Sequence, residues 1–513
     1  MKEKSFTWEG EINEQEIKNF MSTLEEIVSG YLGFKVSFAL EKDSEGGIKA
    51  DAHVDFSVGV PEIAQNIGKE VLERVAFIIN KSLNEYKKLD INVLYNIPRD
   101  LSLSFISDNY LDLPPSEQYE FIKTINALRD IGLETYESAP VNAGVIYCKN
   151  EKSLEKIKKS NGDFININAQ KSISRFFLEE KPLLKLIDNK SLAIVIDHNY
   201  KVCGIIRKKP GEKSLSYMFE SQYNERLIND FKNILFPFYE EVIERVEKES
   251  LEIKVPGETE EEVETFVREM QTVKEKLRGI ANIETTNKCP EYIYFSLENK
   301  VVNIFTDQNF VISYSNGNWK LKHFNLMAAT IMSLLFSQDM HFLLKTPKEE
   351  CNMVFSYLNK GITNLLEIIK NISRNNSSSI FVIIYDDTYS KGFSLTENEA
   401  KEIMERNNFS DNNLERDFLN VIKKDGNHIN IKDADNYLIE TISAVDGAVI
   451  VDQYLNIVSL GEIINVPKEE VYSDTFGTGS KAARYASKAG IAIKISEDGY
   501  IYIYLKNELL LKI

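Results

Sequence analysis

The sequence predicts a multi-domain α/β protein in which smaller α+β units precede a C-terminal mixed sheet flanked by helices. The chain has 513 residues, more than one ordinary core can hold, because domains usually contain about 100–200 residues. Segments with the alternation of strands and segments with the three- and four-residue spacing of helices follow one another throughout the chain. In the last quarter, aliphatic strands carry polar motifs at their ends, which is typical of an α/β domain.

The composition is that of a folded protein with an excess of negative charge. Hydrophobic residues make up 43% and charged residues 27% of the chain, close to the average for globular domains. The formal net charge of -18 opposes attraction to nucleic-acid backbones and anionic membranes. No segment has the ~20 apolar residues of a membrane span, and the four cysteines form no CxxC pair. We therefore expect a cytoplasmic protein without a membrane or nucleic-acid partner.

The first predicted unit, residues 1–112, is a small α+β domain in which no motif indicates chemistry. Helical spacing of apolar residues opens it, and alternating segments follow. Its expected elements are a helix over Ile17–Val28, strands over Phe34–Leu40 and Ala52–Val58, a helix over Pro61–Lys88 and a strand over Leu89–Phe105.

The second predicted unit, residues 113–250, is also α+β. Helices are expected over Glu117–Ile131 and Phe177–Ile187, and a strand over Ala143–Cys148. Its clearest feature is a hairpin within Leu192–Arg207, in which an aliphatic strand ends in aspartate before a polar turn.

The same strand, turn and strand pattern returns at Val301–Asn318 and Gly447–Leu460. Two explanations fit this likeness to the hairpin of the second unit. One is a divergent internal repeat, and the other is the chemistry that hairpins have in common.

A charged helical connector, residues 251–289, is expected next. Thr259 with Glu262 forms a capping box at the start of an amphipathic helix. Residues 290–372 are predicted to form an antiparallel meander and then helices that lead into the last domain, with Asn316-Gly317 as a type I′ turn signal.

The last predicted domain, residues 373–513, carries the motifs that indicate a function. Buried strands alternate with helices, and the polar motifs stand at strand ends and at one helix start. Its expected elements are strands over Ile380–Tyr385, Ala448–Val451, Ile491–Ile495 and Tyr500–Leu505, and helices over Ala434–Ser443 and from Gly477 to Lys488.

The segment Gly477–Lys481 opens a helix with glycine, hydroxyl and lysine residues. Backbone N–H groups and the positive end of the helix dipole at such a start suit a phosphate or ribose oxygen. Asp446 stands before Gly447 at a sharp turn into a strand, where a carboxylate can bind a divalent cation or a sugar hydroxyl. Glu497 and Asp498 form a second acidic position. The GxxxxGK[ST] spacing of a P-loop is absent.

Taken in order, three motifs resemble those of a known family. They are Asp446-Gly447-Ala448, then Gly477-Thr478 with three further residues before Ala482-Ala483, and then Ser496-Glu497. This order is similar to that of the DAC domain of the diadenylate cyclases, whose members carry DGA, GTRHRAA and an SEE-like turn at comparable separations. The resemblance covers about a quarter of the chain, from Ile380 to Tyr504.

The resemblance implies an ATP-binding fold. Asp446 would serve a divalent metal, Mg²⁺ or Mn²⁺, and the 3′-hydroxyl chemistry. In the family, two such domains face each other and join two ATP molecules into cyclic di-AMP, so the resemblance also implies a homo-oligomer. The residues that would line the nucleotide are Gly447, Ala448, Gly477, Thr478, Gly479, Ser480, Lys481, Ser496 and Glu497.

One departure from the family bears on catalysis. Where the family has Arg-His-Arg to grip the triphosphate, this chain has Gly479-Ser480-Lys481. Phosphoryl transfer depends on neutralising the transferring group, so the loss of two such donors costs rate. Backbone donors and small residues can still hold a nucleotide. Lys481, Arg484 and Lys488 are candidates to replace the lost charge.

Three hypotheses follow from these motifs. The first is a cytoplasmic sensor whose degenerate DAC-like domain binds an adenine nucleotide or a cyclic dinucleotide, similar to DAC-derived sensor domains of bacterial signalling systems. The second is an active diadenylate cyclase with Asp446 and Lys481 as catalytic residues and Mg²⁺ or Mn²⁺ as the metal. The third is a scaffold that binds no nucleotide.

Overall fold

The structure is a computed structural model and describes most of the chain. The described ranges are 5–6, 14–42, 48–54, 94–104, 115–159, 162–167, 169–220, 292–305, 311–322, 324–338, 348–384, 397–407, 409–410, 429–444, 447–468 and 477–513, together with a few positions between them.

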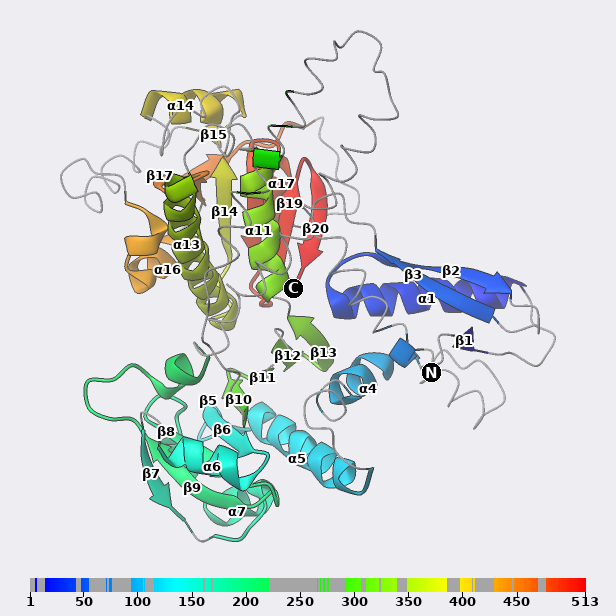
Figure 1. Cartoon of the computed structure of the whole chain (residues 1–513), viewed down its shortest axis with the longest axis vertical. Helices are drawn as coiled ribbons and strands as arrows, with labels where there is room; N and C mark the ends of the chain where they lie inside the picture. Colours follow the sequence, from blue (N-terminus) through cyan, green and yellow to red (C-terminus); the bar gives the residue numbers. More distant parts are fainter. Residues whose placement is uncertain are drawn as a thin grey trace.

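Two large mixed sheets dominate these residues, one in each half of the chain (Figure 1). We call residues 115–322 the first half and residues 348–513 the second half. The first half, cyan to green, lies at the bottom of Figure 1, and the second half, yellow to red, lies at the top. The α/β fold class with a C-terminal mixed sheet flanked by helices is confirmed.

The first half begins with a long helix and contains an eight-stranded sheet. Its elements are α5 (Pro115–Leu133), β4 (Thr135–Tyr136), β5 (Ala139–Pro140), β6 (Ala143–Cys148), α6 (Glu151–Lys158), β7 (Asp163–Asn166), α7 (Ile173–Glu179), α8 (Leu183–Leu186), β8 (Leu192–Ile196), β9 (Val202–Arg207), β10 (Tyr292–Glu298), β11 (Val301–Phe305), β12 (Val311–Ser315) and β13 (Asn318–Lys322).

The second half also begins with a long helix and contains a seven-stranded sheet. The helix α11 (Phe324–Gln338) precedes it and packs on α13. Its elements are α13 (Lys348–Arg374), β14 (Ser379–Ile384), α14 (Glu397–Arg406), β15 (Phe409–Ser410), η3 (Ile431–Asp433), α16 (Asn436–Ser443), β16 (Ala448–Asp452), β17 (Ile457–Ile464), α17 (Thr478–Ala486), β18 (Gly490–Ile495), β19 (Ile501–Leu505) and β20 (Glu508–Lys512).

The two sheets have the same topology. The strand order β7-β9-β8-β6-β10-β11-β12 of the first half matches β15-β17-β16-β14-β18-β19-β20 of the second, and β13 is an addition at one edge. In each sheet one pair is parallel, β6 with β8 and β14 with β16, and the other pairs are antiparallel. The order along the chain matches as well, from the long helix onward.

The hairpin turns of the two halves agree in atomic detail. The Asp197 carboxylate accepts from the backbone N–H groups two and four residues later, both at 2.9 Å. Asp452 accepts from Tyr454 N and Asn456 N in the same way, also at 2.9 Å. The residue three positions after each aspartate, Tyr200 or Leu455, has a positive φ.

This agreement favours an internal repeat over shared hairpin chemistry. The passages Leu192–Arg207 and Gly447–Leu460 occupy equivalent places, β8–β9 and β16–β17. The third similar passage, Val301–Asn318, does not, because it forms β11 and β12.

The domain division differs from the one expected at residues 250, 290 and 373. Strand β10 pairs with β6, so the meander joins the sheet of the expected second unit. Helix α13 packs on α16 and β18, so it belongs with the last domain. The meander itself is confirmed, and Asn316 and Gly317 both have positive φ, as a type I′ turn requires.

The N-terminal module lies against the edges of both sheets. Helices α1 and α4 contact the edge strand β13, and Lys512 N at the edge strand β20 donates to Gly33 O at 2.7 Å. Covering sheet edges in this way protects them from pairing with other chains. The module consists of β1 (Ser5–Phe6), α1 (Glu14–Leu32), β2 (Val36–Lys42), β3 (Ile48–Val54) and α4 (Ile97–Ser104).

Several expected elements differ from the structure. The strand expected over Leu89–Phe105 is wrong, because its described part contains helix α4. The helix expected over Phe177–Ile187 is two short helices, α7 and α8, which Pro182 separates. The predicted helix over Pro61–Lys88 and the connector 251–289 lie almost entirely outside the described residues.

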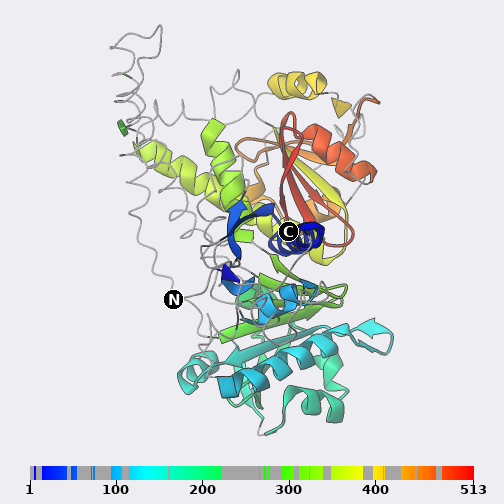
Figure 2. The ribbon, with the colours of Figure 1, turned by 90° about the vertical axis from the view of Figure 1, so that its right-hand side faces the viewer.

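Helices cover both faces of the second sheet, as Figure 2 shows. Because side chains alternate along a strand, Val382 and Ile384 of β14 face the alanines of α17, and Phe381 and Ile383 face the opposite core. That opposite core includes the leucines and isoleucines of α13. The sheet is therefore buried on both faces.

Candidate functional site

The predicted motifs meet at one end of the second sheet. Ala448 at the start of β16 lies beside Ile380 near the start of β14. Strand β18 is antiparallel to β14, so its last residue, Ile495, lies beside Ser379 at the same end. Gly479 in the first turn of α17 lies against the side chain of Lys494 on β18. We call this region the α17 site.

Gly447 is required by the backbone at the start of β16. Its φ is +113°, and a Cβ there would lie 2.3 Å from the backbone of Gly461. No side chain fits at that distance, so glycine allows the first strand of the hairpin to approach the second. The close approach of the two strands thus explains why the DGA motif has glycine at position 447.

Within the described residues, no side chain caps the start of α17. Gly477 is the N-cap, has a φ of 83°, and provides no side-chain cap for the helix. The first N–H groups of a helix have no acceptor inside the helix, so they and the helix dipole favour an anion. Thr478 and Lys481 are exposed, and Gly479 and Ser480 are partly buried.

Lys494 of β18 is a buried cationic residue whose side chain lies against this helix start. Its side chain is 6% exposed, and a Cβ on Gly479 would lie 3.1 Å from its Cε and 3.4 Å from its Nζ. Lys494 Nζ donates to Ile495 O at 2.6 Å and to Ser378 Oγ. Burial lowers the pKa of Lys494, and Glu497 and Asp498 partly oppose this effect.

A row of tyrosines runs along β19 next to this lysine. Tyr502 is the cross-strand neighbour of Lys494. Its ring lies 6.2 Å from that of Tyr500 and 6.3 Å from that of Tyr504, measured between centroids. Burial raises the pKa of Tyr502 to about 12, so its hydroxyl stays protonated at neutral pH. Aromatic faces of this kind suit the stacking of a base.

The turn between β18 and β19 carries the two acidic residues. Ser496 Oγ donates to the Asp498 carboxylate, and Glu497 and Asp498 are both exposed. Ser496 is therefore held within its own turn, and Glu497 faces solvent.

The structure separates the cations that were expected to replace the lost Arg-His-Arg. Arg484 Nε donates to Asn507 O at 2.6 Å, in the turn after β19 at the opposite end of the sheet from Ser496. Lys488 Nζ lies 4.7 Å from the Tyr485 ring centroid, beyond the end of α17. Neither side chain lies at the helix start, so of the three candidates only Lys481 stands there.

A buried carboxylate stands near the start of β16. Glu462 of β17 is the cross-strand neighbour of Ala448, is 2% exposed, and accepts from Ser459 Oγ at 2.8 Å. Asp446 lies outside the described residues. Among the residues that are described, no three His, Cys, Asp or Glu side chains gather as metal ligands. Glu462 is therefore a described carboxylate that lies in register with Ala448, the last residue of the DGA motif.

Sequence reasoning missed Lys494 and Glu462. The signal for both was a single charged residue within an aliphatic strand, GIAIKI for β18 and IVSLGEII for β17. A charged residue in such a position must have partners when buried.

The equivalent end of the first half is closed by backbone and side-chain groups of that half. Residues 215–220 are helical and follow β9, as α17 follows β17. The N–H groups of Leu215 and Ser216 donate to the carbonyls of Lys190 and Asn189 at 2.9 and 3.0 Å. This helix start is therefore occupied by the backbone before β8.

The Asn189 side chain completes this closure. Asn189 is fully buried, and its Nδ2 donates to Ser296 Oγ at 3.0 Å and to Glu298 Oε1 at 2.9 Å. Tyr294 Oη donates to its Oδ1. Ser296 occupies the strand position on β10 that Lys494 occupies on β18. The first half thus has no open counterpart of the α17 site within its described residues.

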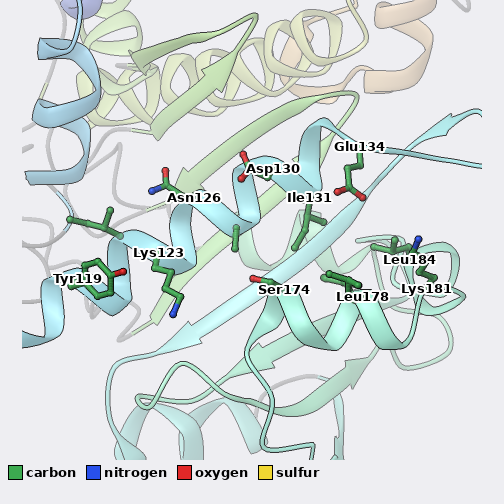
Figure 3. Close-up of a pocket in the computed structure, with 13 residues that line it drawn as sticks. Tyr119, Lys123, Asn126, Asp130, Ile131, Glu134, Ser174, Leu178, Lys181 and Leu184 are labelled. Carbon is green, nitrogen blue, oxygen red and sulfur yellow. The ribbon is translucent and has the colours of Figure 1, made fainter.

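Another cavity lies elsewhere, in the first half (Figure 3). It has a volume of about 710 Å³ and runs between α5 and α7. Lys123 and Asp130 of α5 and Glu134, which follows that helix, line one side, and Leu178 and Lys181 line the other. None of the predicted site residues lines it, so its size alone does not connect it with the motifs.

Comparisons with known proteins leave the family open. Neither a scan against models of protein families nor a search of the curated proteins gives a match to this chain. In the described part of the chain, no helix is both long enough and apolar enough to cross a membrane.

Proposed function

We propose that the second half binds an adenine nucleotide or a cyclic dinucleotide at the α17 site and acts as a cytoplasmic nucleotide sensor. The observation that carries this proposal is the buried Lys494 ammonium beside the glycine-rich start of α17. A cation and a helix N-terminus at the same place favour a phosphate, and Tyr502 on the neighbouring strand offers a face for a base.

The order of motifs that resembles the DAC domain supports the same proposal. Gly479 stands where the family has the first arginine of Arg-His-Arg, and in this chain the Lys494 side chain fills the space next to it. A single lysine replaces part of the positive charge. Binding depends less on that charge than phosphoryl transfer does, so we propose binding without turnover.

The closed site of the first half bears on the cyclase alternative. In the resembled cyclases two open sites face each other. The two halves of this chain cannot provide that pair, because Asn189 closes the first one. An active cyclase would therefore need a second copy of this chain, with Mg²⁺ or Mn²⁺ and Asp446 at each α17 site.

Incubation of the full chain with ATP and Mn²⁺ or Mg²⁺ tests the proposal. We expect a rise in melting temperature and no cyclic di-AMP on chromatography. A ligand at 100 times its Kd stabilises the folded state by about 2.7 kcal/mol. Cyclic di-AMP that disappears in Asp446→Asn would instead establish the cyclase, and the absence of both signals with every adenine nucleotide would favour the scaffold.

A further inference from the structure

A second polar cavity lies where the two halves meet. Its walls are β11, β12 and β13 of the first half, and the end of α13 and the β18–β19 turn of the second half. Ser373 Oγ of α13 donates to Gly499 O of that turn at 2.7 Å. Figure 1 shows β12 and β13 on the side of the first half that faces the second half.

Positive charge dominates this cavity. Four cationic side chains and one carboxylate, Asp498, line it in the described part of the chain. The cationic residues come from both halves and are Lys320 and Lys322 of β13 and Lys370 and Arg374 of α13.

The cations of α13 and those of β13 differ in how their charge is balanced. Arg374 donates to the buried Glu220 carboxylate. Lys320 Nζ lies 3.2 Å from the centroid of the Tyr500 ring, and no ion pair within the described residues joins Lys320 or Lys322 to a carboxylate. Burial lowers the pKa of Lys320 to about 7 and that of Lys322 to about 8.

Two neutral polar residues lie beside Lys320 on the neighbouring strands of the sheet. Asn303, Ser313 and Lys320 are neighbours on β11, β12 and β13. Asn303 is 5% exposed and Ser313 is fully buried, yet Asn303 Oδ1 and Ser313 Oγ have no hydrogen-bond partner. Buried polar atoms normally have a partner, and an amide or a hydroxyl can turn to donate to an anion.

The cavity has the size of a compact ligand. It offers about 30 Å³ to the centre of a water molecule, two to three times the ~10–15 Å³ that one water needs. A tetrahedral oxyanion fits in such a space and a nucleoside does not.

We propose that the cavity between β11–β13 and the end of α13 is a binding site for a phosphate-type oxyanion, with Lys320, Lys322 and Asn303 as its principal donors. The anion balances the lysine charges and supplies acceptors for the buried polar row. Since Lys370 and Arg374 of the second half line the same cavity as these donors, the bound anion lies between the two sheets. The oxyanion can be free phosphate or the terminal phosphoryl group of a larger molecule.

Substituting a lysine by methionine separates a binding role from a structural one. An empty site keeps buried charges close together, so replacing a buried charge by an apolar group of similar volume is neutral or stabilising. Lys320→Met and Lys322→Met should therefore melt no lower than the wild type in chloride buffer. Both should lose the response to oxyanion.

The test is the melting temperature of the full chain with 0 to 20 mM inorganic phosphate at constant ionic strength. We expect a rise of about 3 °C for the wild type and for the exposed control Lys209→Met. In Lys320→Met and Lys322→Met the rise should fall below about one third of that value. No rise in the wild type, or an equal rise in both variants, would overturn the proposal, as would a cavity that holds only water.

A calorimetric titration with sulfate at pH 8 provides a readout that unfolding does not affect. The charge of sulfate does not change at this pH, so heats in two buffers report protons taken up by the protein. We expect net proton uptake in the wild type and none in the Lys320→Met/Lys322→Met double variant. Pyrophosphate and ATP in parallel titrations distinguish a free anion from a phosphoryl group. If sulfate does not bind, the proposal of nucleotide binding at Lys494 still stands, because the two sites share no donor.

Discussion

At the residue scale, Gly447 is a position where the backbone of the α17 site requires glycine. An alanine at this position would have both a positive φ of +113° and a Cβ 2.3 Å from the Gly461 backbone. Backbone strain and overpacking each cost about 1–3 kcal/mol. We expect Gly447→Ala to lower the stability by about 3 kcal/mol or more, measured by thermal unfolding.

Gly317→Ala is the matched control for this prediction. Gly317 also has a positive φ, +82°, but a Cβ added to it would meet no atom within 4 Å. It should show the backbone strain alone, about 1 kcal/mol. Equal losses in the two variants would contradict the close approach of Gly447 and Gly461.

The lysines between the halves predict a pH dependence of stability. Lys320 has a folded pKa of about 7 against an ordinary value of 10.5. Between these values the unfolded chain binds more protons than the folded chain, so the stability rises with pH. The lysine therefore weakens the fold most below about pH 7. Tyr500, Lys322, Lys512 and Asp498 surround it.

We expect the wild type in chloride buffer to gain melting temperature from pH 7 to pH 9 relative to Lys320→Met. The Lys209→Met control should follow the wild type. A wild-type curve parallel to that of Lys320→Met would show that Lys320 keeps its ordinary pKa in the folded chain.

Residue identities could be predicted from the sequence only where a motif contained them. Gly447, Ala448 and the start of α17 stand in motifs, and the structure brings them to one end of the sheet. Lys494 and Glu462 stand alone in aliphatic strands. Their neighbours become visible only when strand register and helix packing are known.

At the scale of elements, the open start of α17 contrasts with the closed start of the helix at 215–220. Asn189 holds that closure through Ser296, Glu298 and Tyr294. Asn189 has a positive φ of 59°, so glycine removes its side chain without adding strain. We expect Asn189→Gly to cost about 2 kcal/mol or more, because buried partners lose their hydrogen bonds.

Thermal unfolding of Asn189→Gly beside Asn316→Gly measures this cost. Asn316 also has a positive φ, 49°, but is exposed in a hairpin turn, so its substitution should change stability little. Nucleotide affinity should be unchanged in both variants. An Asn189→Gly variant that is as stable as Asn316→Gly would contradict the buried hydrogen bonds described for Asn189.

Helices and strands with a clear hydrophobic periodicity could be predicted from the sequence. Helix α4 shows why one element could not. The segment from Leu89 to Phe105 alternates in sequence like a strand. Its fully buried residues Leu94, Ile97 and Leu101 follow a helical spacing instead. Pro98 in the first turn suits a helix start, and packing on β13 selects the helical face.

At the scale of the whole molecule, the repeated topology explains how one chain contains an open site and a closed site. The repeat was only one of two explanations for the similar hairpins, because its strands pair across long stretches of sequence. Strand β6 pairs with β10, for example, although Cys148 and Tyr292 are far apart in the chain. The pairing of distant strands leaves no local pattern, so the domain boundaries could not be predicted.

The contacts around the cationic cavity provide a route by which the proposed sensor site could act on both halves. Arg374 at the end of α13 pairs with Glu220 of the first half, and Ser373 of α13 contacts the β18–β19 turn next to the α17 site. A ligand at Lys494 would therefore act on a turn that contacts both halves. The proposed coupling passes through these described contacts.

The most direct measurement is a calorimetric titration of the full chain with ATP and with cyclic di-AMP, comparing the wild type, Lys494→Gln and Lys506→Gln. Lys506 is exposed in the turn at the other end of the sheet. A hydrogen bond to a charged group contributes about 1.5–3 kcal/mol, so Lys494→Gln should weaken binding about tenfold or more. Lys506→Gln should bind as the wild type does. No binding of either ligand to the wild type, or an unchanged affinity in Lys494→Gln, would contradict nucleotide binding at the α17 site.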